Sequence, residues 1–197
     1  MYVGPAIDDE PILALLPRPY ATLLRQMNGY IAYCGALHVR GACREPLWHS
    51  LRYAWTGDGA LHCLYPNLTA DDIPFAEDAI GDQYVIRDGI VHHLSCETGD
   101  VTSREMDIVD FDAAVRANPF EFLVLGPLQQ FIDEGGTLQP GELLSVMPPL
   151  VINRQSDEPT SVRAIPARER LKWLAMFARK IRDLPDGAQV TFAAGDE

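Results

Sequence analysis

Carboxylates and histidines gather in the middle of the chain, where a hydrolase or a metal site would have to be built. Glu77 with Asp82, or the neighbours His92 and His93 with a nearby acid, supply the residue types of general acid–base pairs and metal ligands. On a strand, however, His92 and His93 point to opposite faces, so they do not converge on one substrate or ion. The sequence therefore predicts no catalysis, and a small hydrolase remains the least favoured alternative.

The four cysteines form no metal-binding or redox motif. Cys34, Cys43, Cys63 and Cys96 lie far apart, and no two of them have the close spacing of a zinc knuckle or a redox pair. Free cysteine packs as a small hydrophobic residue, and a reducing compartment keeps it in the thiol form. We therefore expect no cofactor and no stoichiometric metal ion.

Net charge limits the classes of partner. The 197 residues include 28 acidic and 16 basic side chains, which gives a formal charge of −12 and repels phosphate backbones and anionic membranes. The first residues lack the basic segment of a signal peptide, and no apolar run approaches the roughly 20 residues of a membrane-spanning helix. We expect a cytoplasmic protein that binds neither nucleic acid nor membrane.

The acidic charge is concentrated between residues 71 and 112, which hold twelve acidic and only two basic residues. A field of this sign accelerates encounter with a basic partner. Gly81 indicates a turn that presents neighbouring carboxylates outward. The sequence thus predicts a partner-binding surface made of Asp71, Asp72, Glu77, Asp78 and Asp82. The alternative is that these carboxylates only cap turns and keep a sheet edge in solution.

Secondary structure follows from hydrophobic spacing. Helical periodicity covers residues 20–27, 47–55 and 111–132, with breaks, and apolar or alternating runs predict strands at 37–39, 73–75, 83–87 and 90–96. Asp88-Gly89 joins the last two strands as a hairpin turn. The order of helix, strands and helices predicts an α+β fold with a mostly antiparallel sheet and helices packed on one face.

The C-terminal part has a different character. We expect a main domain over 1–147, whose first residues form a proline-rich lead-in, and a linker-like segment over 148–166. Residues 167–197 predict a helix to about Arg182 and a possible strand at 189–193. Leu171, Leu174, Phe177 and Ile181 fall on one helix face, so this C-terminal helical extension should pack on the main domain.

The middle of the chain resembles a known superfamily. The residues IPFAEDAIGDQY at 73–84 are followed by a strand, Asp88-Gly89, a second strand and Glu97-Thr98-Gly99-Asp100. This order resembles the core of the SMI1/KNR4, or SUKH, superfamily. Upstream, Leu16-Pro17 and a helix that ends at Asn28-Gly29 are similar to the start of that domain. The resemblance covers roughly residues 16–135.

The resemblance implies a compact α+β domain that binds other proteins and has no shared catalytic residues. Many bacterial members are immunity proteins that neutralise a toxin, often a nuclease or a deaminase, and eukaryotic relatives are regulatory scaffolds. We therefore expect a non-catalytic immunity protein that binds a toxin domain with a basic surface. An intracellular regulatory scaffold is the alternative.

Overall fold

The computed structural model describes residues 1–152, 160–185, 187, 188 and 190. Seven antiparallel strands form one sheet in which every strand pairs with the next along the chain, and two further strands form a small second sheet. The seven strands are β1 (Tyr2–Val3), β2 (Tyr30–Ala32), β3 (Leu37–Val39), β4 (Ile73–Asp78), β5 (Gln83–Arg87), β6 (Ile90–Leu94) and β7 (Val101–Ser103). The small sheet contains β8 (Glu142–Met147) and β9 (Ser161–Pro166).

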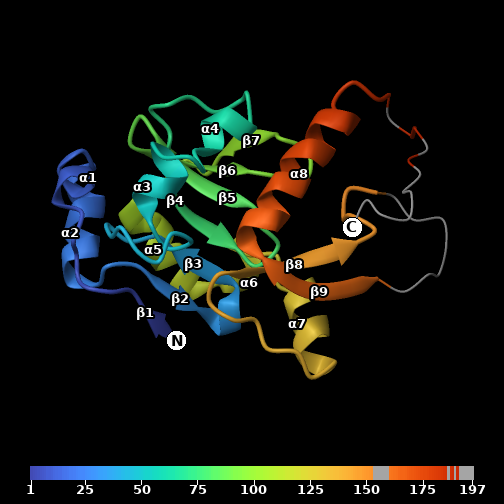
Figure 1. Ribbon diagram of the computed structural model, residues 1–197, viewed down its shortest axis with the longest axis horizontal. Coiled ribbons are helices and arrows are strands. Elements are labelled where there is room, and N and C mark those ends of the chain that lie inside the picture. The colour runs from blue at the N-terminus through green and yellow to red at the C-terminus, as the bar shows by residue number, and fades with distance from the viewer. Residues whose placement is uncertain (153–159, 186, 189, 191–197) are drawn as a thin grey trace.

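Helices lie before, between and after the strands (Figure 1). They are α1 (Glu10–Ala14), α2 (Arg18–Gln26), the 3-10 turn η1 (Tyr33–Gly35), α3 (Leu51–Trp55), α4 (Leu61–Leu64), α5 (Ile108–Ala117), α6 (Pro119–Phe122), α7 (Gly126–Asp133) and α8 (Ala167–Ile181). The predicted α+β class with an antiparallel sheet and a C-terminal helix is confirmed.

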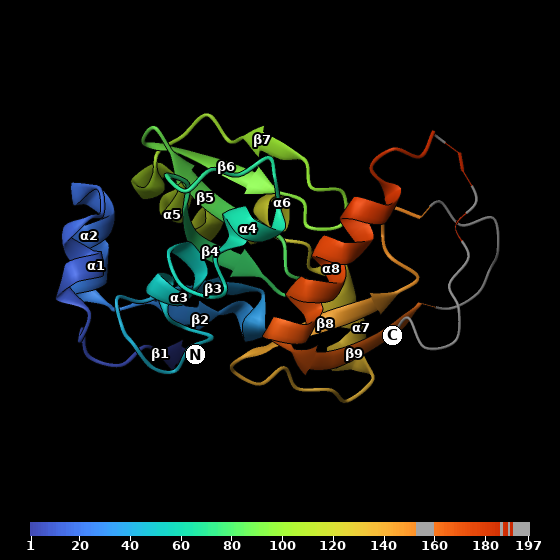
Figure 2. The same cartoon turned by 45° about the horizontal axis from the view of Figure 1, so that its top comes forward.

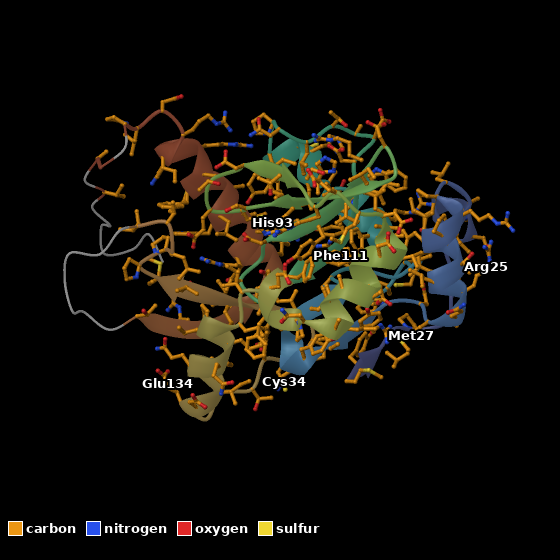
Figure 3. The ribbon with its side chains drawn as sticks, turned by 180° about the vertical axis from the view of Figure 1, so that it is seen from behind. Arg25, Met27, Cys34, His93, Phe111 and Glu134 are labelled. Carbon is orange, nitrogen blue, oxygen red and sulfur yellow. The ribbon has the colours of Figure 1, made fainter. Side chains whose placement is uncertain are left out.

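The large sheet is covered on both faces because its strands alternate apolar side chains between them. In β5, Tyr84 and Ile86 join the main core, which α2 and α5 cover, whereas Val85 joins a second core under α4 and α8. Figure 3, the view from behind, shows α5 with Phe111 on the face opposite to α8. The C-terminal helix therefore closes a face of the sheet that the other long helices leave free.

The segment expected to be a linker is partly a strand. Residues 161–166 form β9, which pairs with β8 from Glu142↔Pro166 to Met147↔Ser161. The prediction of a linker over 148–166 is wrong for this half, because Val162 is buried opposite Val146 while the polar residues of the strand face outward. The strand expected at 189–193 lies outside the described residues except for Val190.

Helix α8 packs on the rest of the chain as expected. Leu174 and Phe177 are buried, and Leu171 and Ile181 are partly buried. The helix runs beside β8 and β9 and crosses the end of the β4–β5 hairpin (Figure 2). Residues 167–181 therefore belong to the same folded unit as the sheet.

This packing predicts a large loss of stability when the buried face of α8 is truncated. Leu174→Ala should lower the free energy of unfolding by about 2–5 kcal/mol, because it removes buried methyl groups and leaves a cavity. Met176→Ala on the exposed side of the same helix is the matched control and should cost less than about 1 kcal/mol. Chemical denaturation measures both, and equal effects would contradict the assigned packing.

Candidate functional site

Strands β3, β4 and β5 hold a buried network of charged side chains. His38 and Glu77 are paired across β3 and β4, and His38 Nδ1 lies 2.8 Å from Glu77 Oε1. The Arg40 guanidinium donates to Glu77 Oε2 at 2.6 Å and to Gln83 Oε1 at 2.8 Å. Gln83 Nε2 completes the set by donating to Glu77 Oε2 at 3.0 Å. Both oxygens of the glutamate are thus engaged inside the protein.

These contacts hold Glu77 in its ionised form. Burial alone would raise the pKa of this carboxyl, but the positive charge of Arg40 and the hydrogen bonds from His38 and Gln83 outweigh burial and lower the pKa to about 2. A carboxylate with such a low pKa takes up almost no proton near neutral pH, so it is a poor general base. The network therefore stabilises the fold and is not a catalytic acid–base pair.

The network extends to the N-terminal part of the chain through His49. His38 Nε2 lies 2.9 Å from His49 Nδ1, and His49 Nε2 donates to the backbone oxygen of Asn28 at 2.9 Å. Burial lowers the pKa of His38 and lowers that of His49 to about 4. Trp48 and Tyr2 pack against the two imidazoles in tilted and edge-on arrangements. The lead-in, the β3–α3 connection and the sheet are thus held together at this point.

A cavity of about 650 Å³ lies beside the network. Its walls come from β1, β2, η1 and the loop between α7 and β8, and His38 and Glu77 contribute to its inner end. Its volume is that of a small-molecule pocket. Both His38 nitrogens and both Glu77 oxygens are already engaged within the fold, whereas Cys34, which also lines the cavity, is an exposed free thiol.

The prediction of an acidic surface around Gly81 is wrong for four of its five residues. The exposed fractions of Asp72, Glu77, Asp78 and Asp82 are 4%, 3%, 1% and 6%, and only Asp71 is exposed. Helix α8 covers the turn: a Cβ added at Gly81 would lie 2.9 Å from Leu174 Cδ1. The carboxylates therefore point into the protein, as in the alternative that gave them a structural role.

Asp78 stabilises the turn between β4 and β5. Its Oδ1 accepts hydrogen bonds from the backbone nitrogens of Ile80, Gly81 and Asp82, each at 3.0 Å. Burial and the neighbouring Asp82 carboxylate raise the pKa of Asp78. One side-chain oxygen thus accepts from three buried backbone donors, of which the Gly81 nitrogen also donates to the Asp78 backbone oxygen at 3.3 Å.

The two other buried acids also have structural partners. Asp72 forms an ion pair with Arg87 at 2.7 Å and accepts from the backbone nitrogen of Thr69. Asp82 accepts from the backbone nitrogen of Cys96 at 2.8 Å, and its second oxygen lies 3.2 Å from His93 Nε2. Each carboxylate thus holds a strand end or a turn.

The remaining candidates for metal binding do not converge. His93 pairs with Tyr84 across β5 and β6, whereas His92 pairs with Val85 and so faces the other side of the sheet. Cys43 and Cys96 are buried free thiols, and Cys34 and Cys63 are exposed free thiols. In the part of the chain that the structure describes, no three histidine, cysteine, aspartate or glutamate side chains are placed to hold a metal ion.

An exposed acidic surface does exist, at a place that the sequence did not indicate. Val91 in β6 exchanges backbone hydrogen bonds with Arg104 and Met106, which brings the β5–β6 hairpin beside the start of α5. We call this region the acidic end. It comprises the exposed residues Asp88, Glu105, Asp107 and Asp110. Ile90 and Val109, which are 36% and 48% exposed, add apolar area to it.

Only the pairing of strands reveals this surface. Glu105, Asp107 and Asp110 are far in sequence from Asp88, and residues 71–112 also contain the buried acids Asp72, Glu77, Asp78, Asp82 and Glu97. Exposed Asp71 lies next to Asp72, whose partner Arg87 precedes the hairpin turn, so one of the five predicted residues flanks the acidic end. In the sequence, only the Asp88-Gly89 turn pointed to an exposed acid at this place, because hairpin turns lie at the surface.

Comparisons with known proteins bear on the fold. No protein-family model matches the chain, and the search of curated proteins finds no match. The crystal structure of Atu4351 from Agrobacterium tumefaciens is similar, with a TM-score of 0.56 and 17% sequence identity over 88% of this chain and 81% of that chain. At this identity the likeness shows the fold alone.

None of the described helices has the length and apolar character needed to cross a bilayer. The longest helix, α8, has 15 residues and several charged side chains.

The Glu77 network predicts an acid-sensitive stability. The pKa of Glu77 in the folded protein is about 2 and the ordinary value is 4.5, so its contribution is complete above about pH 4.5 and disappears as the pH falls toward 2. Glu77→Gln should lower the unfolding free energy at pH 7 by about 3–5 kcal/mol, because Arg40 then lies buried without a counter-charge. The difference between wild type and variant should shrink below pH 4.5.

Urea denaturation from pH 7 to pH 2.5 measures this difference. Exposed Glu105→Gln is the control and should change stability by less than about 0.5 kcal/mol. If the Glu77 variant does not fold, an NMR titration of the Glu77 carboxyl in the wild type tests the same point. A midpoint near pH 4.5 would disprove the assignment.

Asp78 gives a second prediction. Asp78→Asn keeps an oxygen acceptor for the three backbone donors, whereas Asp78→Ala removes it, so alanine should be less stable than asparagine by about 1–3 kcal/mol. Because the pKa of Asp78 is raised in the fold, the wild type loses stability as the pH rises above the ordinary value of 3.8, and the asparagine variant does not. Thermal melts at pH 4 and pH 8 should show the asparagine variant gaining relative to the wild type.

Proposed function

We propose that this protein is a non-catalytic protein-binding domain of the immunity type, which acts in the cytoplasm and neutralises a toxin domain with a basic surface by direct binding. The observation that carries the proposal is the acidic end, where four exposed carboxylates surround exposed Ile90 and Val109. Apolar area within a charged rim is the composition of a protein-binding surface.

The state of the buried carboxylates supports the non-catalytic part of the proposal. Glu77 is bonded to Arg40, Asp72 to Arg87, and Asp9 to Arg52 at 2.5 Å. Glu97 accepts from the backbone nitrogens of Leu150 and Val151 at 3.1 and 2.8 Å. These acids serve the fold, and among the described residues no ion pair joins an exposed acid to a histidine. A hydrolase has no comparable support.

The resemblance to the SUKH superfamily concerns a different part of the molecule from the proposed binding surface. Residues 73–84 form β4, the turn that Asp78 holds, and the start of β5, and all of them are buried. They specify the centre of the sheet. The acidic end lies at the opposite end of β5, after Arg87, where side chains are free to differ without disturbing the core.

Identification of the partner is the decisive experiment. The tagged protein is purified from its native source after crosslinking, and the crosslinked peptides are located by mass spectrometry. The proposal expects a one-to-one complex with a toxin domain, crosslinks near residues 88–110, and inhibition of the toxin by the purified protein. A partner without toxic activity would favour the regulatory scaffold instead.

Charge reversal at the acidic end should slow association with that partner. Asp88→Lys, Glu105→Lys and Asp110→Lys together should lower the association rate about 10-fold or more at low salt, with a smaller effect near 1 M salt, where the Debye length is about 3 Å. The matched control reverses three exposed acids on α6 and at the end of α7, namely Glu121, Asp133 and Glu134. Stopped-flow binding measures both, and an equal slowing by the control would show only a net-charge effect.

A further inference from the structure

Helix α8 has an exposed face whose charge is opposite to that of the chain as a whole. Its other side is buried in the core. We call the outward side the basic face. Its exposed residues are Arg168, Lys172, Met176, Arg179 and Lys180, together with one acid, Glu169. These residues recur at three- and four-residue intervals, which aligns them along one side of the helix.

The positive charges of the basic face are not neutralised within the described part of the chain. No carboxylate there lies within ion-pair distance of Arg168, Lys172 or Lys180. Arg179 donates to the backbone oxygens of Cys63 and Leu64 at 3.3 and 3.0 Å, and these partners carry no net charge. Those two bonds also fix the guanidinium against α4, so one cation is already positioned.

A shallow hollow lies between the basic face and α4. Its volume is about 320 Å³, and Leu64, Ala175 and Met176 form its apolar wall. Lys172, Arg179 and Lys180 stand around it. The Met176 side chain is 43% exposed there, and methionine adapts its shape to an apolar group that packs on it. The hollow therefore suits an aliphatic side chain with a carboxylate on each side.

We propose that the basic face of α8 binds a short acidic peptide segment of a partner protein, with an aliphatic side chain of that segment in the hollow. Lys172 and Lys180 are about 12 Å apart along the helix, the length of about four extended residues. A short segment spans only this face, where Glu169 is the one exposed acid among the four basic residues named above. A nucleic acid duplex or an anionic bilayer extends further and would meet the rest of a chain whose formal charge is −12.

The test uses a fluorescently labelled peptide with a central leucine flanked by two glutamates on each side. Fluorescence polarisation at 50 mM salt should show saturable binding. The double variant Lys172→Glu with Lys180→Glu should weaken binding about 10-fold or more. Replacing the central leucine of the peptide by glycine should also weaken binding, by a smaller factor. The matched control is Arg18→Glu with Arg25→Glu, two exposed cations on α2 that give the same change in net charge. Figure 3 labels Arg25 on this helix. The control should weaken binding less than 2-fold.

Several results would overturn the proposal. They are the absence of binding at 1 mM peptide, an equal loss in the α2 control, or an unchanged affinity in the α8 variant with an unchanged melting curve. Tighter binding of a single-stranded oligonucleotide or of phosphatidylserine vesicles through the same lysines would assign the face to another class of ligand. Charge reversal at the acidic end should leave peptide binding intact or strengthen it, so failure here is separate from failure of the proposed function.

Discussion

The ion pair between Glu77 and Arg40 is the interaction on which the architecture depends. Both side chains are buried, and such a pair is tolerated only when every charge has partners. Gln83 and His38 supply these partners from the neighbouring strands, and His49 continues the chain of hydrogen bonds to Asn28. One network therefore connects strands β3, β4 and β5 with the segment before α3, which contains His49, and with Asn28 after α2. Hydrophobic contacts, which are less directional, would not specify these positions equally well.

The burial of this network separates the parts of the molecule that maintain the fold from those that are free to bind. Acids in β4 and in the following turn bind Arg40 and backbone nitrogens. Helix α8 packs over this turn. The acids that remain exposed lie around the β5–β6 hairpin and the start of α5. The basic residues of α8 lie on a separate face. A strongly acidic chain thus presents two surfaces of opposite sign.

The sequence alone was informative where local rules govern. Spacing of apolar residues predicted β5, β6 and α2 to within about two residues, and Asp88-Gly89 marked a hairpin because Gly89 has φ +82°. The periodicity of α8 correctly predicted which side of the helix is buried. The same rules missed the two-residue β1 and the six-residue strands β8 and β9, because these strands acquire their identity from the strand they pair with. Proline and polar residues before Ser161 made the whole stretch resemble a linker.

What the sequence determined by itself was composition, charge, the α+β order of elements and the amphipathic helix, since each depends on residues close in the chain. Only the tertiary structure decided which acids are exposed. Asp78 and Asp88 look equivalent as turn aspartates, yet Asp78 is 1% exposed because α8, some ninety residues later, packs over its turn. Asp88 remains exposed because no other segment of the described chain packs over its turn. A Cβ added at the neighbouring Gly89 would have nothing within 4 Å. Burial of a charge depends on contacts between distant segments, and local sequence patterns do not encode those contacts.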